Sequence, residues 1–178
     1  MVTRAVVVLP LHDARIERFR RDFDPLGDAI PAHVTLVYPT PVDLAAARDA
    51  MVRAAGRRPS FEYAFSEPAV VEDEYLFLLA QRGAEEFRDV HADLYRQLGR
   101  PLPDVFRPHV TIARTADAAR RDAARSTALA QGLRIAGTAT ALCLYRLDGP
   151  GRLVREQVVP FANRSEEKNG RWPSRPRA

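Results

Sequence analysis

The sequence has little of several residue types that would mark a functional class. Its 178 residues include one cysteine, Cys143, one tryptophan and one lysine. A single cysteine excludes an intramolecular disulfide and any metal cluster built on several cysteines. Cys143 lies in the apolar run 141–144, where a small buried side chain is expected. The longest apolar stretch near the start, residues 5–11, is too short to cross a bilayer, so we expect a cytoplasmic protein without a membrane anchor.

Net charge is also scarce. The chain carries 27 basic and 23 acidic residues, a formal charge of +4, and residues 162–178 supply +3 of it. The nearly neutral remainder is poor evidence for a long nucleic-acid track. All basic residues except Lys168 are arginines, which suits phosphate contacts but is equally explained by genomic base composition. Residues 162–178 are polar and without apolar periodicity, so they are predicted to form a flexible basic tail with Trp172 exposed.

Hydrophobic periodicity indicates the order strand, helix, strand, helix, strand twice. This order indicates an internal duplication, with repeats of about 1–73 and 74–161 inside a single domain of residues 1–161. Two similar lobes would meet at a cleft, which is where a site is expected. The predicted strands are residues 6–9, 33–38, 61–65 and 69–71, then 75–79, 109–114, 133–145 and 153–159; the predicted helices begin at Asp13, Asp43, Glu85 and Asp117.

The most informative feature is a pair of His-x-Thr motifs, one on the same strand of each repeat. His33 and Thr35 stand in His-Val-Thr-Leu, and His109 and Thr111 stand in His-Val-Thr-Ile. Because residues i and i+2 of a strand share a face, each histidine projects together with its threonine while the apolar neighbours face the core. Facing lobes would bring two imidazoles and two hydroxyls into one pocket.

This set of groups suits phosphodiester chemistry without a metal. Imidazole titrates near neutral pH, so one histidine can accept a proton while the other donates one. Threonine hydroxyls can donate to non-bridging phosphate oxygens. A zinc site is disfavoured, because two histidines with threonines lack the carboxylate or thiolate that usually completes such a site.

The paired motifs resemble those of the two-histidine (2H) phosphoesterase superfamily, in its 2′-5′ RNA ligase/cyclic phosphodiesterase (LigT-like) branch. The resemblance implies that His33 and His109 are the catalytic acid/base pair and that Thr35 and Thr111 bind phosphate. It implies opening of 2′,3′-cyclic phosphates of RNA ends or small nucleotides, in some members joining of RNA ends through a 2′-5′ linkage, and no metal or other cofactor.

Together, the duplication and the resemblance predict an α+β, internally duplicated bilobal fold. Two antiparallel-sheet lobes would face a central cleft, with the helices outside. The first and last strands are expected to share a lobe, because residues 153–159 otherwise lack a partner beyond their own hairpin.

Arg114 is a further candidate for phosphate binding, since related sequences often carry a basic residue just after the second motif. Strict alternation would turn it away from His109, although twist at the strand end could return it. Tyr38 holds the equivalent place after the first motif and is either a base-stacking or a packing residue. His12 and His91 are interpreted as ordinary surface or boundary residues.

Two other functions remain open at this stage. One is a nucleotide- or RNA-binding module without turnover. The other keeps the chemistry but changes the substrate to 2′,5′-oligonucleotides or an ADP-ribose cyclic phosphate.

Overall fold

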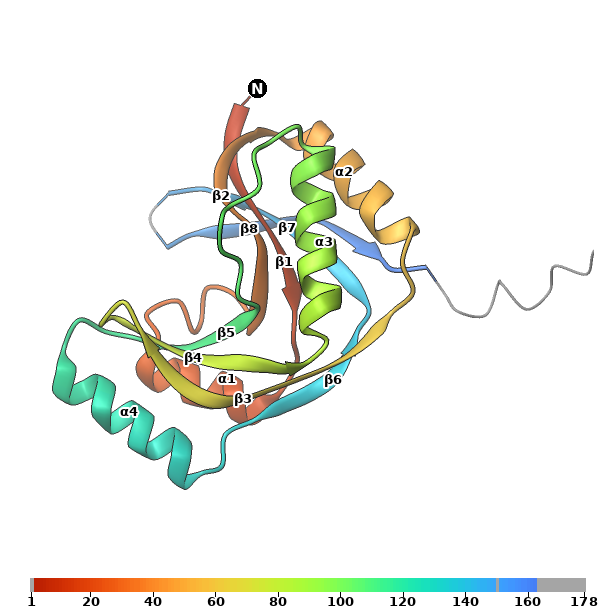
Figure 1. The fold of residues 1–178 in the computed structure, drawn as a ribbon. Helices are drawn as coiled ribbons and strands as arrows, with labels where there is room; N and C mark the ends of the chain where they lie inside the picture. The colour runs from red at the N-terminus through yellow and green to blue at the C-terminus, as the bar shows by residue number, and fades with distance from the viewer. Residues whose placement is uncertain (1, 150, 163–178) are drawn as a thin grey trace, which may run out of the picture.

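Two four-stranded antiparallel sheets form the framework of the computed structural model, which describes residues 2–149 and 151–162 (Figure 1). Sheet 1 has the order β2-β1-β7-β8, and sheet 2 has the order β5-β4-β3-β6. The first and last strands share sheet 1, which confirms that prediction. Sheet 1 comprises β1 (Val2–Pro10), β2 (His33–Asp43), β7 (Ala141–Leu147) and β8 (Leu153–Pro160), and sheet 2 comprises β3 (Phe61–Val71), β4 (Tyr75–Arg82), β5 (His109–Arg114) and β6 (Ile135–Ala139).

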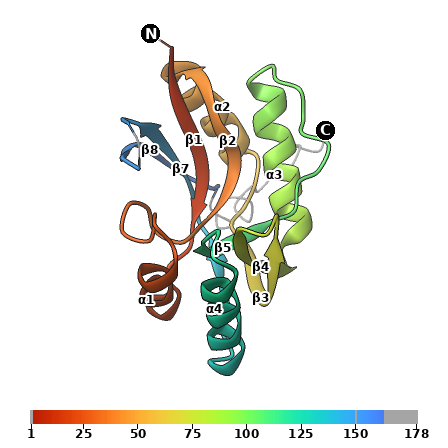
Figure 2. The ribbon, with the colours of Figure 1, turned by 90° about the vertical axis from the view of Figure 1, so that its left-hand side faces the viewer.

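In the described residues four helices cover the sheets, and in each repeat the first helix packs on the other repeat's motif strand. The helices are α1 (Ala14–Phe23), α2 (Leu44–Gly56), α3 (Ala84–Gln97) and α4 (Ala118–Ala130). Helix α1 follows β1 of sheet 1 but packs on β5 of sheet 2, whereas α3 follows β4 of sheet 2 and packs on β2 and α2 (Figures 1 and 2). This exchange ties the two lobes together, so neither is an independent consecutive unit.

Aspartates start three of the helices, as predicted. The carboxylate of Asp13 accepts hydrogen bonds from the amides of Arg15 and Ile16, and Asp43 caps α2 in the same way. Asp117 accepts from the third amide beyond it. These bonds satisfy amides that have no intrahelical partner, which explains why the helices begin at these residues.

The largest departure from the prediction concerns residues 133–145. They are not one strand, because β6 ends at Ala139 and β7 begins at Ala141, and the two strands belong to different sheets. The chain crosses between the lobes at Thr140, whose carbonyl accepts from the amide of Phe161 at 2.9 Å. Similarly, residues 69–71 are the end of β3 and not a separate strand, since a register shift near Ser66 only interrupts the ladder.

The core lies between the sheets and their helices, and it contains the apolar residues of both motif strands. Val34, Leu36, Val110 and Ile112 are all buried, as the alternation predicted, and the buried Cys143 also agrees with its prediction. None of the helices in the described part of the chain is long and apolar enough to span a membrane. Residues 163–178, most of the predicted tail including Trp172, lie outside the described residues.

Candidate active site

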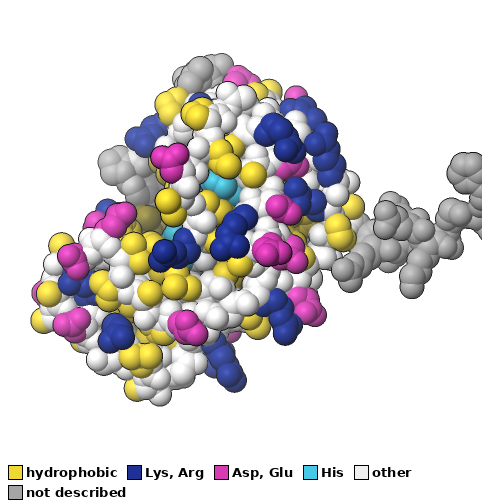
Figure 3. Space-filling view, viewed as in Figure 1, with side chains coloured by type: hydrophobic (Ala, Val, Ile, Leu, Met, Phe, Trp, Pro, Cys, Tyr) yellow, Lys and Arg dark blue, Asp and Glu magenta, His cyan; other side chains and the backbone are white. Residues whose placement is uncertain are grey.

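The two His-x-Thr motifs meet at the junction of the lobes. Strand β2 is the edge of sheet 1, β5 is the edge of sheet 2, and the two edges contact each other. A cavity of about 560 Å³ opens between them, and its lining includes His33, Thr35, His109 and Thr111. In the space-filling view, histidine is visible only as small recessed patches, with arginine and hydrophobic side chains beside them (Figure 3). The structure therefore brings all four predicted motif side chains to one cleft.

Each imidazole is oriented by the same backbone contact. His33 Nδ1 lies 2.7 Å from the carbonyl oxygen of Pro31, and His109 Nδ1 lies 2.7 Å from that of Arg107. A carbonyl oxygen only accepts, so Nδ1 carries the hydrogen in both rings. Nε2 is then the nitrogen left to face a ligand, as a lone pair in the neutral ring and as a donor in the charged ring.

A β-bulge interrupts each motif strand at the same place. Val8 of β1 pairs with Thr35 and Val7 pairs with Val37, so one extra residue, Leu36, is inserted in β2. The β4–β5 ladder inserts Ile112 in the same way. Two consecutive buried residues follow each threonine, and the strand's alternation is reset beyond them.

Because of the bulges, the residue five positions after each histidine lies on the cleft side. Arg114 and Tyr38 both line the cavity. Strict alternation would have turned Arg114 away from His109, and the bulge at Ile112 breaks that alternation. Tyr38 is 38% exposed, so it is not a core packing residue.

Arg114 is held by neighbours from β4 and the turn before it. Its Nε donates to the Glu74 carboxylate at 2.6 Å, and its guanidinium lies 5.3 Å from the centre of the Tyr75 ring. The remaining guanidinium nitrogens stay available for a second acceptor. This arrangement limits the motion of the Arg114 guanidinium and can direct it at a phosphate in the cleft.

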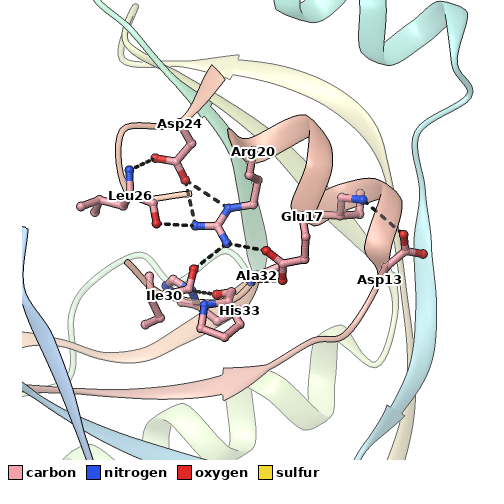
Figure 4. A network of polar contacts seen from close by, with 10 residues as sticks. Asp13, Glu17, Arg20, Asp24, Leu26, Ile30, Ala32 and His33 are labelled. Atoms are coloured by element: carbon pink, nitrogen blue, oxygen red, sulfur yellow. Dashed lines mark hydrogen bonds and ion pairs between the residues drawn. The ribbon is translucent and has the colours of Figure 1, made fainter. Parts of the chain in front are cut away.

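Behind His33 lies a buried ion pair that sequence reasoning missed (Figure 4). Arg20, 1% exposed, donates from Nε and Nη2 to one carboxylate oxygen of Asp24 at 3.1 and 2.9 Å. Its Nη1 donates to the carbonyl of Ile30 at 2.8 Å, and the other oxygen of Asp24 accepts from the Leu26 amide at 3.0 Å. The pair thereby folds the loop from α1 to β2 around one guanidinium.

The same network reaches the residue before the first motif histidine. Glu17 accepts from the Ala32 amide at 2.7 Å and lies 3.5 Å from Arg20. Since His33 follows directly and bonds to Pro31, the loop and the imidazole form one hydrogen-bonded unit (Figure 4). An Arg–Asp pair four residues apart at the end of a helix is common on protein surfaces. The sequence therefore could not distinguish this pair, and only its burial in the structure does.

His109 packs against an aromatic ring and not against an ion pair. Its ring stacks on Phe77 of β4, with centroids 3.7 Å apart and planes 16° from parallel. Burial lowers the pKa of both motif histidines. For His33 the pKa falls to about 4, because burial and the nearby Arg20 guanidinium disfavour a second positive charge. Both rings are therefore neutral at pH 7 before substrate binds.

His91 was predicted to be an ordinary surface or boundary residue, and the structure buries it. It is 2% exposed on α3, and its ring stacks on Phe106 with centroids 3.8 Å apart. Its Nδ1 donates to the carbonyl of Leu36, the extra residue of the β2 bulge, at 2.7 Å. The amphipathic pattern of α3 placed His91 beside buried positions, but nothing in the sequence marked an unpaired strand carbonyl opposite it.

The rest of the cleft has two unlike flanks. Glu72, Tyr75 and Phe77 line one side, from the β3–β4 hairpin and β4. The apolar part of the lining consists of Val6, Leu26, Ile30, Leu147 and Leu153, and Arg152 lines the cavity next to Leu153. Among residues 2–149 and 151–162, no group of three or more His, Cys, Asp or Glu side chains is placed to hold a metal ion.

Two antiparallel sheets, each bringing a His-x-Thr edge strand to a shared cleft, are the architecture of the two-histidine (2H) phosphoesterase superfamily. The family model of the 2′-5′ RNA ligase superfamily matches residues 8–151, and the chain belongs to that superfamily. No curated protein matches the chain.

Solved structures give the same fold at low sequence identity. E. coli LigT complexed with 3′-AMP is 17% identical with a TM-score of 0.63, over 92% of this chain and 100% of that one. The protein TT0787 of Thermus thermophilus is 16% identical with a TM-score of 0.63, over 90% and 99%. E. coli LigT has also been solved with NADP+, at 18% identity and a TM-score of 0.59, over 90% and 99%. These matches confirm the duplicated α+β fold.

Proposed function

We propose that the protein is a metal-independent phosphodiesterase that opens 2′,3′-cyclic phosphates of RNA ends or small nucleotides. The observation that carries the proposal is the pair of imidazoles at one cleft, each with Nδ1 held by a backbone carbonyl and Nε2 left free. Family membership and the 3′-AMP held by the similar E. coli LigT support a nucleotide substrate.

In the proposed reaction His33 and His109 act as the acid/base pair. The neutral imidazole removes a proton from water as the water oxygen bonds to phosphorus. The bond from phosphorus to one ribose oxygen breaks, and the protonated imidazole donates to that oxygen, which leaves a phosphomonoester and a free hydroxyl. Thr35, Thr111 and Arg114 donate to the non-bridging oxygens, where charge accumulates. A ribose 5′-hydroxyl in place of water would give the 2′-5′ ligation.

The lowered pKa values give the proposal a specific pH dependence. The reaction needs one neutral and one protonated imidazole, and both pKa values lie below 6.5 in the free enzyme. We therefore expect a bell-shaped profile of kcat/KM with its maximum below about pH 6.5. The anionic phosphate favours the imidazolium, so the profile of kcat should lie at higher pH.

The deciding experiment uses adenosine 2′,3′-cyclic phosphate in excess EDTA. We expect adenosine monophosphate to form, with the 2′- and 3′-isomers separated by chromatography. Binding without product would reject the phosphodiesterase in favour of a binding module, and activity that EDTA abolishes would reject the metal-free mechanism. The same assay with a 2′,5′-linked dinucleotide and an ADP-ribose cyclic phosphate ranks the substrate classes. An RNA-end substrate and a single reduced cysteine fit a cytoplasmic enzyme.

A further inference from the structure

A second, smaller recess adjoins the active-site cleft. Its volume is about 240 Å³, and it shares Asp24 and Arg114 with the cleft. It lies where the end of α1 meets the connection from β5 to α4, and its lining is Arg21, Asp22, Phe23, Asp24, Pro25, Arg114, Thr115 and Arg120. We call it the arginine recess. Arg114 stands between the two cavities, so a group in the recess lies next to one held by the catalytic residues.

The charges of the arginine recess leave it positive. Asp24 is neutralised by Arg20, and Arg114 is paired with Glu74. Arg21 and Arg120 have no carboxylate within ion-pair distance in the described part of the chain, and both are exposed. Asp22 is the one opposing carboxylate. Two uncompensated guanidiniums against one carboxylate give the recess a net positive charge before any ligand arrives.

The recess also offers directed donors. Arg120 Nη2 donates to the backbone carbonyl of Asp22 at 2.7 Å, which fixes its guanidinium between α4 and α1 and leaves its other nitrogens free. Thr115 Oγ1 accepts from the Asp117 amide at 3.2 Å, so its hydroxyl hydrogen remains available to a ligand. Guanidiniums beside a hydroxyl are the donor set that recognises a phosphate.

We propose that the arginine recess binds a second phosphate of the same substrate, attached to the nucleoside whose cyclic phosphate lies between His33 and His109. This inference rests on the proposed function and names its substrate class more closely, as a cyclic-phosphate nucleotide that carries a further phosphate. That phosphate is either a terminal 5′-phosphate or the internucleotide phosphodiester of an RNA end. Both present the same non-bridging oxygens, and the test separates them.

The experiment compares three substrates that share one cyclic phosphate. They are adenosine 2′,3′-cyclic phosphate with a free 5′-hydroxyl, the same compound with a 5′-phosphate, and the dinucleotide in which a 5′ adenosine is joined through a phosphodiester. We expect a second phosphate to lower KM at least about tenfold, which corresponds to one charge-assisted hydrogen bond. The double variant Arg21→Gln/Arg120→Gln should lose this preference and keep its rate on the 5′-hydroxyl compound.

Matched controls come from the same two helices. Arg18 on α1 and Arg125 on α4 are exposed and lie outside both cavities, so Arg18→Gln/Arg125→Gln makes the same charge change elsewhere. It should retain the preference. Thermal unfolding of both double variants checks that the loss of the Arg120 contact has not unfolded the protein.

The outcomes separate the arginine recess from the proposed function. A preference for the dinucleotide alone assigns the recess to RNA ends, and a preference for the 5′-phosphate as well assigns it to any such phosphate. Equal KM values for all three substrates, or a preference that survives Arg21→Gln/Arg120→Gln, would overturn the recess and leave the phosphodiesterase standing. If no substrate is turned over, the proposed function fails, and calorimetric binding of the same compounds still decides the recess, because only a real site loses affinity in the double variant.

Discussion

The two motif strands share the geometry of their histidines and differ in what stands behind them. In β2 and β5 alike, the imidazole Nδ1 bonds to a carbonyl two residues upstream, a threonine follows on the same face, and a bulge resets the alternation. Behind His33 lies a buried Arg–Asp pair, whereas His109 stacks on Phe77 and is followed by an arginine held by a partly exposed carboxylate.

The difference indicates which features the proposed chemistry requires twice and which it requires once. Two proton transfers need two oriented imidazoles, so the orientation is the same in both strands. One phosphate needs one cation beside it, and Arg114 in β5 supplies it while β2 has Tyr38 at the equivalent place. The two histidines are therefore alike in orientation, while the residue five positions after each one is an arginine in β5 and a tyrosine in β2.

The largest expected effect tests the shared part of the comparison. His33→Ala and His109→Ala should each lower kcat about 10³-fold or more on adenosine 2′,3′-cyclic phosphate, because each removes one proton transfer. The double variant should be little worse than either single variant, since the two transfers serve one reaction. Product formation over time, measured by chromatography, gives the rates of all three variants. Retention of most activity by either single variant would contradict the assignment of that histidine.

The next effect tests the unlike surroundings through stability. Asp24→Ala leaves the Arg20 guanidinium buried without its carboxylate, which should reduce the free energy of unfolding by about 3–5 kcal/mol. Glu74→Ala is the matched control beside the second motif, where the ion pair is partly exposed, and it should cost at most about 1 kcal/mol. Urea unfolding of both variants measures the difference. Equal losses would show that burial does not distinguish the two pairs.

Much of this comparison could be predicted from the sequence, because it depends on local pattern. The repeated order of elements, the His-x-Thr spacing and the buried apolar neighbours gave the duplication, the shared cleft and the core side of each motif strand. Asp13, Asp43 and Asp117 marked three helix starts, since capping is a contact between residues close in the chain.

The parts that failed depend on contacts between distant segments. A bulge needs a partner strand to define the extra residue, so alternation alone put Arg114 on the wrong side. The crossing at Thr140 exists because the two halves of residues 133–145 pair with different sheets. The burial of Arg20 and His91 likewise comes from elements that fold over them, the loop before β2 in one case and β2 itself in the other.

His91 allows a test of whether the first bulge is held from outside the cleft. His91→Phe keeps an aromatic ring against Phe106 but leaves the carbonyl of Leu36 without its donor, so it should reduce stability by about 1–3 kcal/mol. Without the bond to Leu36 the bulge is expected to shift, and Tyr38, two residues further along β2, should shift with it. KM should therefore rise in His91→Phe, while kcat stays near that of the wild type. His91→Asn restores a donor at the position of Nδ1, so its KM should return to that of the wild type, although its smaller side chain leaves a void that lowers stability. An equal change in both variants would indicate packing alone.

The smallest effect concerns the pH dependence of stability, and it separates the two histidines directly. The pKa of His33 is about 4 in the folded protein against about 6.5 in the unfolded chain, so the unfolded chain binds more protons between these values. Stability is then fully present above pH 6.5 and falls as the pH drops toward 4. Between about pH 7.5 and about pH 5.5 the loss attributable to His33 should be about 1 kcal/mol.

His33→Asn keeps a donor for the Pro31 carbonyl and does not titrate, so its unfolding midpoint in urea should fall less on acidification than that of the wild type. His109→Asn is the matched variant in the second strand. The pKa of His109 is also lowered by burial and by the charge of the exposed Arg107, but in the described part of the chain no guanidinium as deeply buried as that of Arg20 lies behind it, so its variant should remove a smaller part of the slope. If acidification changes the unfolding midpoint less in His109→Asn than in His33→Asn, then His109 carries more of the pH dependence. That result would contradict the inference that the buried Arg20 guanidinium acts mainly on His33.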